Sequence, residues 1–312
     1  MAGGGSCTVK KDRRMGKEEC PKNIRFSFIR ELSSNHQVSW LCQIAGVSRA
    51  GYYKWLKRQA HITAKDREDY RLQTLLRNGY LRHRGRYGYR RMQVWLNRHT
   101  GQTYNHKRVY RLLDIAGLKA KIRRRKHWYG GPAEAGTVSP NLLNRQFEAN
   151  APNRRWVSDV TYLPGPDKTF YLSAIKDLAT NKIIAYRISD RNDLKLVRDT
   201  LLSAIRKQRK KVCGILIHSD QGFQYTSKTY QTLLQRYGMI ASMSRKGNCL
   251  DNAAMESFFS HLKTESLYLE KFSSSAQMIR AVRSYIHYYN EERIQVKLNK
   301  LAPVAYRRQL AG

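Results

Sequence analysis

The sequence is poor in acidic residues. It contains 23 Asp and Glu against 59 Lys and Arg among 312 residues, which gives a formal net charge of +36. Such an imbalance argues against an ordinary metabolic enzyme and favours a polyanionic partner, because a chain this basic repels itself and attracts anions. Nucleic acid is the expected partner, since Lys and Arg contacts release the counterions that condense on phosphates.

Long apolar runs are also missing. No stretch approaches the roughly 18 consecutive apolar residues of a membrane-spanning helix, and no basic amphipathic helix stands apart from the globular pattern. An anionic membrane is therefore the weaker alternative partner. The first residues, Met1 to Ser6, lead into charged residues instead of the apolar core of a secretory signal. We expect a cytoplasmic protein associated with DNA.

Cysteine pairs are absent. No Cys-x-x-Cys pair occurs, and no His pair stands at the spacing that zinc requires. Five scattered cysteines without such partners are expected to be reduced and mostly structural. They are Cys7, Cys20, Cys42, Cys213 and Cys249.

The residues that are present predict a first helix-turn-helix outline near the N-terminus. Residues 1–24 lack periodicity and are expected to form a disordered lead-in. The apolar pattern from Val38 to Ala45 predicts a helix, Gly46 a break, and Ser48 the cap of a second helix. Two interpretations stay open for this outline, which are a DNA-contacting unit and a plain helical hairpin.

A second helix-turn-helix unit is predicted further along. Residues 89–98 have the pattern of a helix, 101–104 interrupt it, Asn105 has the character of an N-cap, and 106–115 continue as a helix that Gly117 ends. The second of these helices is the expected recognition helix, whose N-terminal residues meet base edges or phosphates.

A basic run continues through and beyond this unit. Between Asp69 and Glu134 the sequence has a single acid, Asp114, but seventeen Lys and Arg, interleaved with aromatic residues. So little compensating acid favours DNA contact over a merely solvated basic face. The predicted DNA-binding residues are Lys107, Arg108, Arg111, Lys119, Lys121, Arg123, Arg124, Arg125 and Lys126.

The C-terminal half has the pattern of an α/β domain. Strands are predicted at 156–162, 170–175, 183–188, 213–217 and 239–243. Helices are predicted at 194–208, 227–237, 252–264 and 276–289, before a basic tail that contains Pro303. This order predicts a mixed sheet flanked by helices. The expected domains are a lead-in (1–24), a helical DNA-binding region (25–128), a linker with one small helix (129–152), a catalytic core (153–270) and a C-terminal helix with the tail (271–312).

Three carboxylates lie at informative places in that order. Asp159 falls inside the first strand, where an acid is costly unless it meets positive charge. Asp220 follows a strand at its carboxyl end, and Glu256 lies in a helix whose apolar neighbours press it toward the sheet. Oxygen ligands of this kind favour Mg²⁺ or Mn²⁺. Two such ions support in-line displacement at a phosphodiester, so metal-dependent DNA cleavage and strand transfer is the hypothesis.

The sequence around these acids resembles a known family. The intervals from Asp159 to Asp220 and on to Glu256 hold 60 and 35 residues. With the segments 156–162, 218–222, 242–248 and 251–259, this spacing is similar to the insertion-sequence branch of the DDE retroviral-integrase-like transposases, and to its downstream-frame (OrfB-type) product. The resemblance extends over roughly residues 36–310.

The resemblance implies a ribonuclease-H-like catalytic fold, cutting and joining at the ends of a mobile element, and action as a homo-oligomer on paired DNA ends. It also implies an upstream-frame helix-turn-helix partner or fusion, since no sustained heptad repeat is present here.

Further site residues are inferred on the same basis. Lys263 is expected to contact DNA near the cut, with a surface salt bridge as the alternative. Asn252 is placed on the side of Glu256, whereas Asp251 is interpreted as a helix cap. Gly222 is expected to allow a tight turn after Asp220. The remaining predicted DNA contacts are Arg245 and Lys246, in a basic loop, and His218 is interpreted as a core residue instead of a catalytic base.

Four other functions are alternatives to this one. A non-enzymatic architectural DNA binder would account for the charge but leaves the three acids unexplained. A catalytically inactive or partner-dependent DNA-binding regulator of transposition is the second alternative. A ribonuclease-H-like nuclease would prefer an RNA–DNA hybrid. Tyrosine or serine recombinase chemistry is disfavoured, because the proposed reaction needs no covalent protein–DNA intermediate.

Overall fold

A computed structural model describes residues 22–60, 63–121, 138–149, 151–209, 211–245 and 249–310. The chain divides into two compact units, Met1–Leu72 and Gln73–Gly312. The sequence-based predictions for residues 1–21, for Arg123 to Lys126 and for Lys246 lie outside the described residues. In the described chain, no helix is both long and apolar enough to cross a membrane.

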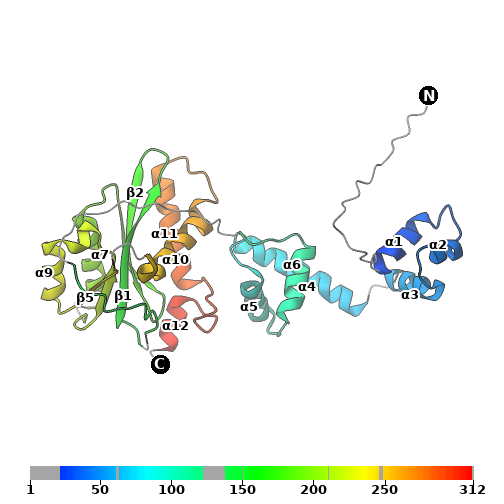
Figure 1. Cartoon of the computed structure of the whole chain (residues 1–312), viewed down its shortest axis with the longest axis horizontal. Coiled ribbons are helices and arrows are strands. Elements are labelled where there is room, and N and C mark those ends of the chain that lie inside the picture. Colours follow the sequence, from blue (N-terminus) through cyan, green and yellow to red (C-terminus); the bar gives the residue numbers. More distant parts are fainter. Residues whose placement is uncertain are drawn as a thin grey trace. The chain divides into compact units, whose positions relative to one another are not determined.

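Three short helices lie in residues 22–60 of the first unit, drawn in blue in Figure 1. They are α1 (Lys22–Leu32), α2 (Val38–Ile44) and α3 (Arg49–Ala60). The helix-turn-helix outline of α2 and α3 agrees with the sequence, and Gly46 (φ +64°) adopts the left-handed conformation that ends α2. The start of α1 at Lys22 overlaps the predicted lead-in, and α1 itself was missed. Its buried Ile29 packs with the core residues Leu41, Cys42 and Tyr52.

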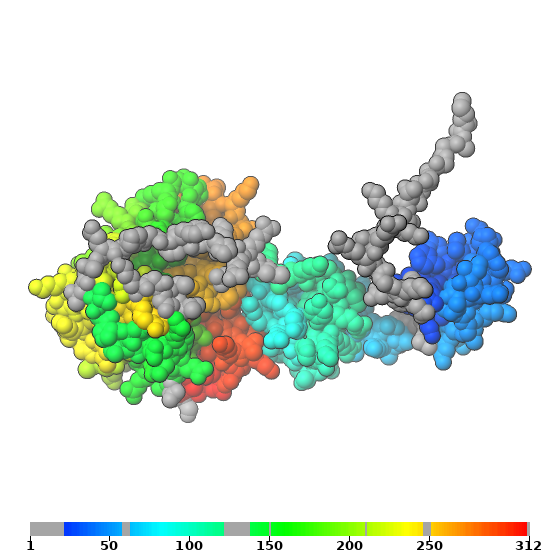
Figure 2. Space-filling view, viewed as in Figure 1, coloured from blue at the N-terminus to red at the C-terminus, as the bar shows by residue number. Residues whose placement is uncertain are grey.

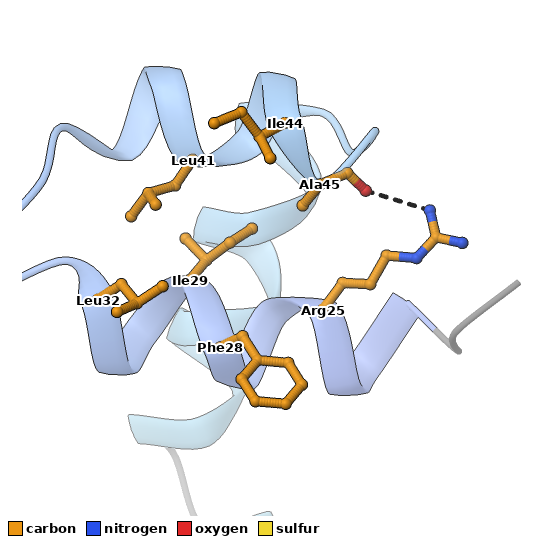
Figure 3. Close-up of a pocket in the computed structure, with 7 residues that line it drawn as sticks. All are labelled: Arg25, Phe28, Ile29, Leu32, Leu41, Ile44 and Ala45. Carbon is orange, nitrogen blue, oxygen red and sulfur yellow. Dashed lines mark hydrogen bonds between the residues drawn. The ribbon is translucent and has the colours of Figure 1, made fainter. Parts of the chain in front are cut away.

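An apolar groove separates α1 from α2 (Figure 3). The Arg25 guanidinium crosses it, with Nη1 donating to the Ala45 carbonyl at 3.1 Å. This bond satisfies a carbonyl at the end of α2, and a cation is well placed there because carbonyl dipoles accumulate at a helix C-terminus. Arg25 therefore ties α1 to the turn that precedes α3. The groove is lined by Arg25, Phe28, Ile29, Leu32, Leu41, Ile44 and Ala45.

The second predicted helix-turn-helix is formed by α5 (Tyr89–Thr100) and α6 (His106–Ile115). Asn105 is its N-cap as predicted, with the Oδ1 atom accepting from the Lys107 backbone N–H at 2.8 Å. The preceding helix α4 (Ala64–Arg82), which runs across the division between the two units, was not predicted. Its sequence mixes charged and apolar residues without a clean period.

The linker prediction was wrong in one respect. Over residues 138–149 the chain forms no helix, although Leu142, Leu143 and Phe147 suggested one. Leu143 is fully buried, and the backbone N–H groups of Leu142 and Leu143 donate to the Ser242 Oγ atom at 2.9 and 3.1 Å. These amides are satisfied by a distant strand, so a local helix offers no advantage.

A mixed sheet of five strands forms the centre of the second unit, as the sequence predicts. The strands are β1 (Arg155–Pro164), β2 (Thr169–Asp177), β3 (Ile183–Ser189), β4 (Leu216–Ser219) and β5 (Ile240–Met243). Their order is β3-β2-β1-β4-β5, with β1, β2 and β3 antiparallel and with β4 parallel to both β1 and β5. The β4 strand starts later than predicted, which leaves Cys213 exposed before it.

Helices flank this sheet (Figure 1). The helices α7 (Leu194–Lys207) and α9 (Lys228–Arg236) cover the side where Trp156, Val197 and Leu201 are buried. On the other side, the predicted single helix 252–264 is divided into η1 (Cys249–Asn252), α10 (Ala253–Leu262) and the π-helical turn η2 (Lys263–Leu267). The unit also contains α8 (Phe223–Thr226) and α11 (Ser275–Glu291).

The C-terminal tail was also mispredicted, because residues 303–309 form a helix. The helix α12 (Pro303–Gln309) has Pro303 at its first turn, where a missing N–H costs nothing. It is red in Figure 2, and its Arg307 Nη1 atom lies 3.4 Å from Asn153 Oδ1 and 3.9 Å from the buried Asp177 carboxylate. These contacts join α12 to the segment before β1 and to the end of β2.

Candidate active site

Two of the predicted acids lie close together, Asp159 in β1 and Asp220 directly after the neighbouring strand β4. The parallel register pairs Val157 of β1 with His218 of β4. Asp159 lies two residues after Val157 in β1, and Asp220 directly follows β4, which ends at Ser219. Adjacent strands are only about 4.8 Å apart, and the charge of Asp220 acts on the Asp159 carboxyl. Because side chains alternate along a strand, Asp159 faces away from the core that surrounds Trp156 and toward the side of α10.

Both carboxyl groups resist ionisation. Burial raises the pKa of Asp159 well above its usual range, and the neighbouring charge of Asp220 raises it further. The Val160 backbone N–H, which donates to Asp159 Oδ1 at 2.7 Å, opposes this shift only in part. Burial also raises the pKa of Asp220. Two acids that repel each other in a half-buried place form a natural position for a cation.

The third acid, Glu256, reaches this pair from α10. The helix is anchored through Met255, Phe258 and other buried side chains, which leaves Glu256 exposed in its first turn. The charge of Glu256 raises the pKa of Asp159, while that of Lys263 lowers it. The charges of Asp220, Glu256 and Lys263 therefore all act on the Asp159 carboxyl.

The three carboxylates nevertheless do not form a closed ligand set. Among the described residues, no three His, Cys, Asp or Glu side chains lie close enough together to hold a metal ion. The site consists of the adjacent pair Asp159 and Asp220, with Glu256 acting from a greater distance.

Gly222 leaves room for the Asp220 carboxylate. Its backbone N–H donates to Asp220 Oδ1 at 3.0 Å, and a Cβ atom at Gly222 would also lie 3.0 Å from that oxygen. Its φ of −58° is open to any residue. The close approach, and not a special turn conformation, is the physical reason for glycine here.

Asp251 is an anchor for two arginines and not the helix cap that the sequence suggested. The N-cap of α10 is Asn252, which makes no side-chain capping bond. The fully buried Asp251 carboxylate accepts from Arg245 Nε and Nη2, both at 3.0 Å, and from Arg145 Nε at 2.9 Å. The hydrogen bonds from Arg245 hold the pKa of Asp251 well below its usual range. The guanidinium of Arg245, a predicted DNA contact, is therefore held by Asp251.

The two other polar residues near the site are buried. Asn252 is 5% exposed, and its Oδ1 atom has no hydrogen-bond partner among the described residues. His218 lies in the core as predicted, with Nδ1 2.9 Å from Ser242 Oγ. Burial lowers the pKa of His218 to about 4, so this imidazole is neutral at physiological pH.

The predicted DNA-binding residues of α6 lie on one helix face. Lys107 and Arg111 are exposed, four residues apart, together with Tyr110. Arg108 is half-buried and packs over the Tyr104 ring at 5.8 Å. Lys119 and Lys121 are exposed beyond the helix.

Sequence reasoning missed Lys176, which ties β2 to the helix that carries Glu256. This buried lysine at the end of β2 donates through Nζ to the Ala254 carbonyl at 3.2 Å, in the first turn of α10. A lysine directly after a predicted apolar strand was the available signal. Arg145 was missed as well, because its partner Asp251 is 106 residues away in the chain.

Comparisons with known proteins agree with this arrangement. Residues 149–249 and 256–310 match two models named "Integrase core domain", and residues 65–126 match one named "HTH-like domain". The transposase for insertion sequence element IS904 of Lactococcus lactis is 41% identical over 222 residues, which cover 71% of this chain and 87% of that protein. The chain belongs to the insertion-sequence transposases. Transposase InsF for insertion sequence IS3A of Escherichia coli is 34% identical over 84% of this chain and 91% of that protein.

Solved structures of viral integrases show a more distant similarity to this transposase. A simian T-cell lymphotropic virus intasome in complex with PP2A regulatory subunit B56 gamma is 19% identical, with a TM-score of 0.43 over 70% of this chain and 69% of that one. The HTLV-2 integrase catalytic core in complex with magnesium is 15% identical, with a TM-score of 0.38 over 52% of this chain and 99% of that one.

Family membership confirms several predictions from the sequence. The transposase has a ribonuclease-H-like catalytic core preceded by a helical DNA-binding region, and it acts on DNA as a polynucleotidyl transferase of the DDE type. Members of the integrase core family use divalent metal ions.

The electrostatics of the site predict a stability effect. In metal-free buffer at pH 7, Asp159→Asn is expected to raise Tm by a few degrees. The folded-state pKa of Asp159 is raised, so ionising this carboxyl costs folding stability at every pH above its unfolded pKa of about 4. The gain should therefore shrink as the pH falls toward about 4.

Thermal denaturation in EDTA between pH 4 and pH 8 measures this effect. Asp114→Asn, which removes an exposed carboxylate on α6, is the matched control and should leave Tm unchanged. A lower Tm for Asp159→Asn than for wild type at pH 7 would contradict the electrostatic assignment.

Proposed function

We propose that Asp159, Asp220 and Glu256 are the metal-binding carboxylates with which this transposase cuts and joins the ends of its DNA element. The observation that supports this most is the effect of Asp220 and Glu256 on the Asp159 carboxyl, whose pKa both of them raise. Acids that repel one another in the absence of a cation gain electrostatic stabilisation when they bind a cation.

The donor set fits hard divalent cations. All three side chains offer carboxylate oxygen, which suits Mg²⁺ or Mn²⁺ and is a poor zinc site. Asp159, Asp220 and Glu256 would hold the ions between the sheet and α10. When bound, two such ions activate the attacking oxygen and stabilise the leaving oxygen of an in-line phosphoryl transfer.

The chain's own residues then have distinct tasks. Lys176 holds the first turn of α10 near the sheet through the Ala254 carbonyl. It thereby fixes the distance of Glu256 from the sheet. Lys263 supplies positive charge beside Asp159, where we infer that it meets a phosphate near the cut. Gly222 keeps the Asp220 carboxylate in place by its backbone N–H. Asn252 lies directly before α10, where we infer that it helps to hold Glu256 in position.

DNA contact is assigned to the α6 face and the residues after it. This assignment predicts a steep salt dependence of DNA affinity, to which each phosphate contact contributes about 0.9 units of log–log slope. Lys107→Ala/Arg111→Ala is expected to lower the slope by about two units. Fluorescence anisotropy with duplex DNA at several salt concentrations measures it. Lys228→Ala/Arg236→Ala, on the exposed side of α9, is the charge-matched control and should leave the slope nearly unchanged.

The domain limits at 25–128, 129–152, 153–270 and 271–312 are part of this proposal, as are a homo-oligomer on paired ends and an upstream-frame partner. The proposal is tested by Mg²⁺-dependent cleavage and joining of labelled duplexes that carry the ends of the element, with and without the upstream-frame product. Metal-dependent products at the element ends support it. Tight binding without cleavage under every condition would instead favour a regulator, and preferential cutting of RNA–DNA hybrids a ribonuclease.

A further inference from the structure

The helix α3 presents a basic outer face that the function described so far does not use. On its inner side, Tyr52 is buried and Trp55 and Leu56 pack against the same small core. The exposed positions recur at the spacing of a single helix face. They are Arg49, Ala50, Tyr53, Lys54 and Lys57.

Little acid offsets this charge within the described helices α1 to α3. The described residues 22–60 contain one acid, Glu31 in α1, and α3 contains none. An uncompensated basic helix face with an exposed tyrosine is chemically suited to phosphate and to the edges or faces of bases. Ala50, between Arg49 and Tyr53, adds no bulk that would keep a duplex away.

The three helices have the architecture of a helix-turn-helix. Gly46 turns the chain after α2, and Ser48 Oγ accepts from the Gly51 backbone N–H at 3.1 Å to close the first turn of α3. The bond from Arg25 to the Ala45 carbonyl ties α1 to this turn. In such units the second helix of the pair enters the major groove with its N-terminal residues foremost. Arg49 occupies that position in α3.

We propose that α3 is a second recognition helix, which binds duplex DNA at the element end separately from the segment bound through α6. This unit, at residues 22–60, lies outside the 65–126 segment that matches the HTH-like model. The sequence left open a DNA-binding unit and a plain hairpin, and the one-sided exposed charge of α3 favours DNA. Binding of this kind needs no catalysis, so the proposal stands independently of the metal-binding carboxylates.

The test is a footprint of the full-length chain on element-end DNA in a Glu256→Gln background, where cleavage is not expected to interfere. The Glu256→Gln protein without further substitutions is expected to protect two segments of the DNA. Lys54→Ala/Lys57→Ala should lose one of them and lower the salt slope by about two units, whereas Lys107→Ala/Arg111→Ala should lose the other. This pair of variants separates a failure of α3 from a failure of the α6 assignment.

Lys22→Ala/Arg30→Ala is the matched control, because it removes two exposed positive charges of α1 from the same unit. It should retain both protected segments. If Lys54→Ala/Lys57→Ala also protects both DNA segments, α3 does not bind DNA. That result overturns the proposal, whatever the salt dependence of the affinity. Both variants change only exposed side chains, so unchanged circular dichroism is expected for each.

Discussion

Glu256→Gln is expected to abolish cleavage and joining of element ends while DNA binding persists. The amide keeps the size and hydrogen-bonding reach of the side chain but removes the negative charge that a divalent cation requires. Losing one carboxylate ligand forfeits several kcal/mol of transition-state stabilisation, which corresponds to a rate loss of about a thousandfold or more. Glu256 is exposed on α10, so the amide needs no rearrangement of the buried core.

The measurement is single-turnover cleavage of labelled duplex in Mg²⁺, with affinity determined in parallel. Asp159→Asn and Asp220→Asn should behave in the same way, because the three acids act on one position. Glu291→Gln, an exposed carboxylate at the end of α11, is the matched control and should cleave normally. Wild-type cleavage by any one of the three site variants would refute its assignment as a metal ligand.

Glu265→Gln is expected to destabilise the fold by about 3–5 kcal/mol, because it removes one partner of a buried ion pair. Glu265 is 5% exposed, and its carboxylate accepts from Arg293 Nε at 2.9 Å and from Arg293 Nη2 at 2.7 Å. The Tyr285 hydroxyl donates to it at 2.9 Å, and Arg91 Nη1 lies 3.6 Å away. Burial raises the pKa of Glu265, but the bonds and charge of Arg293 outweigh it and leave the pKa lowered.

This carboxylate joins segments that are far apart in the sequence. It lies in the π-helical turn η2, where the Tyr268 backbone N–H donates to the Lys263 carbonyl at 2.8 Å, five residues back. Arg86, just before α5, donates through Nε to the Glu265 carbonyl at 2.8 Å. Residues of the helical DNA-binding region therefore contact the segment that carries Lys263. We expect Glu265→Gln to slow cleavage as well as to lower stability.

A double-mutant cycle with Arg293→Met tests the ion pair. The two single variants each leave a buried charge without its partner, so the double variant should be less destabilised than the sum of the singles. Urea denaturation measures the free energies of unfolding. A loss within about 0.5 kcal/mol for Glu265→Gln, as at an ordinary surface position, would contradict the assignment. Because the pKa of Glu265 is lowered, its contribution is present above the unfolded pKa and is lost on acidification through the folded one.

Local patterns carried most of the fold prediction. Helices with a capping signal were placed well, as with Asn105 before α6 and Ser227 before α9, because a cap and an apolar period are properties of neighbouring residues. The failures share a cause. The Leu142 and Leu143 pair suggested a helix, but their amides bind Ser242, about a hundred residues away, which no local pattern records.

The sequence by itself determined the partner class, the mixed sheet and the identity of the candidate acids. Charge balance, periodicity and motif spacing depend only on the composition and order of the residues. Only the tertiary structure decided which side chains surround each acid. Because β1 pairs with β4, Asp159 lies near Asp220, which directly follows β4, whereas burial with two arginines makes Asp251 an anchor instead of a cap. Pairing and burial depend on residues brought together from distant segments, and these are fixed only when the chain has packed.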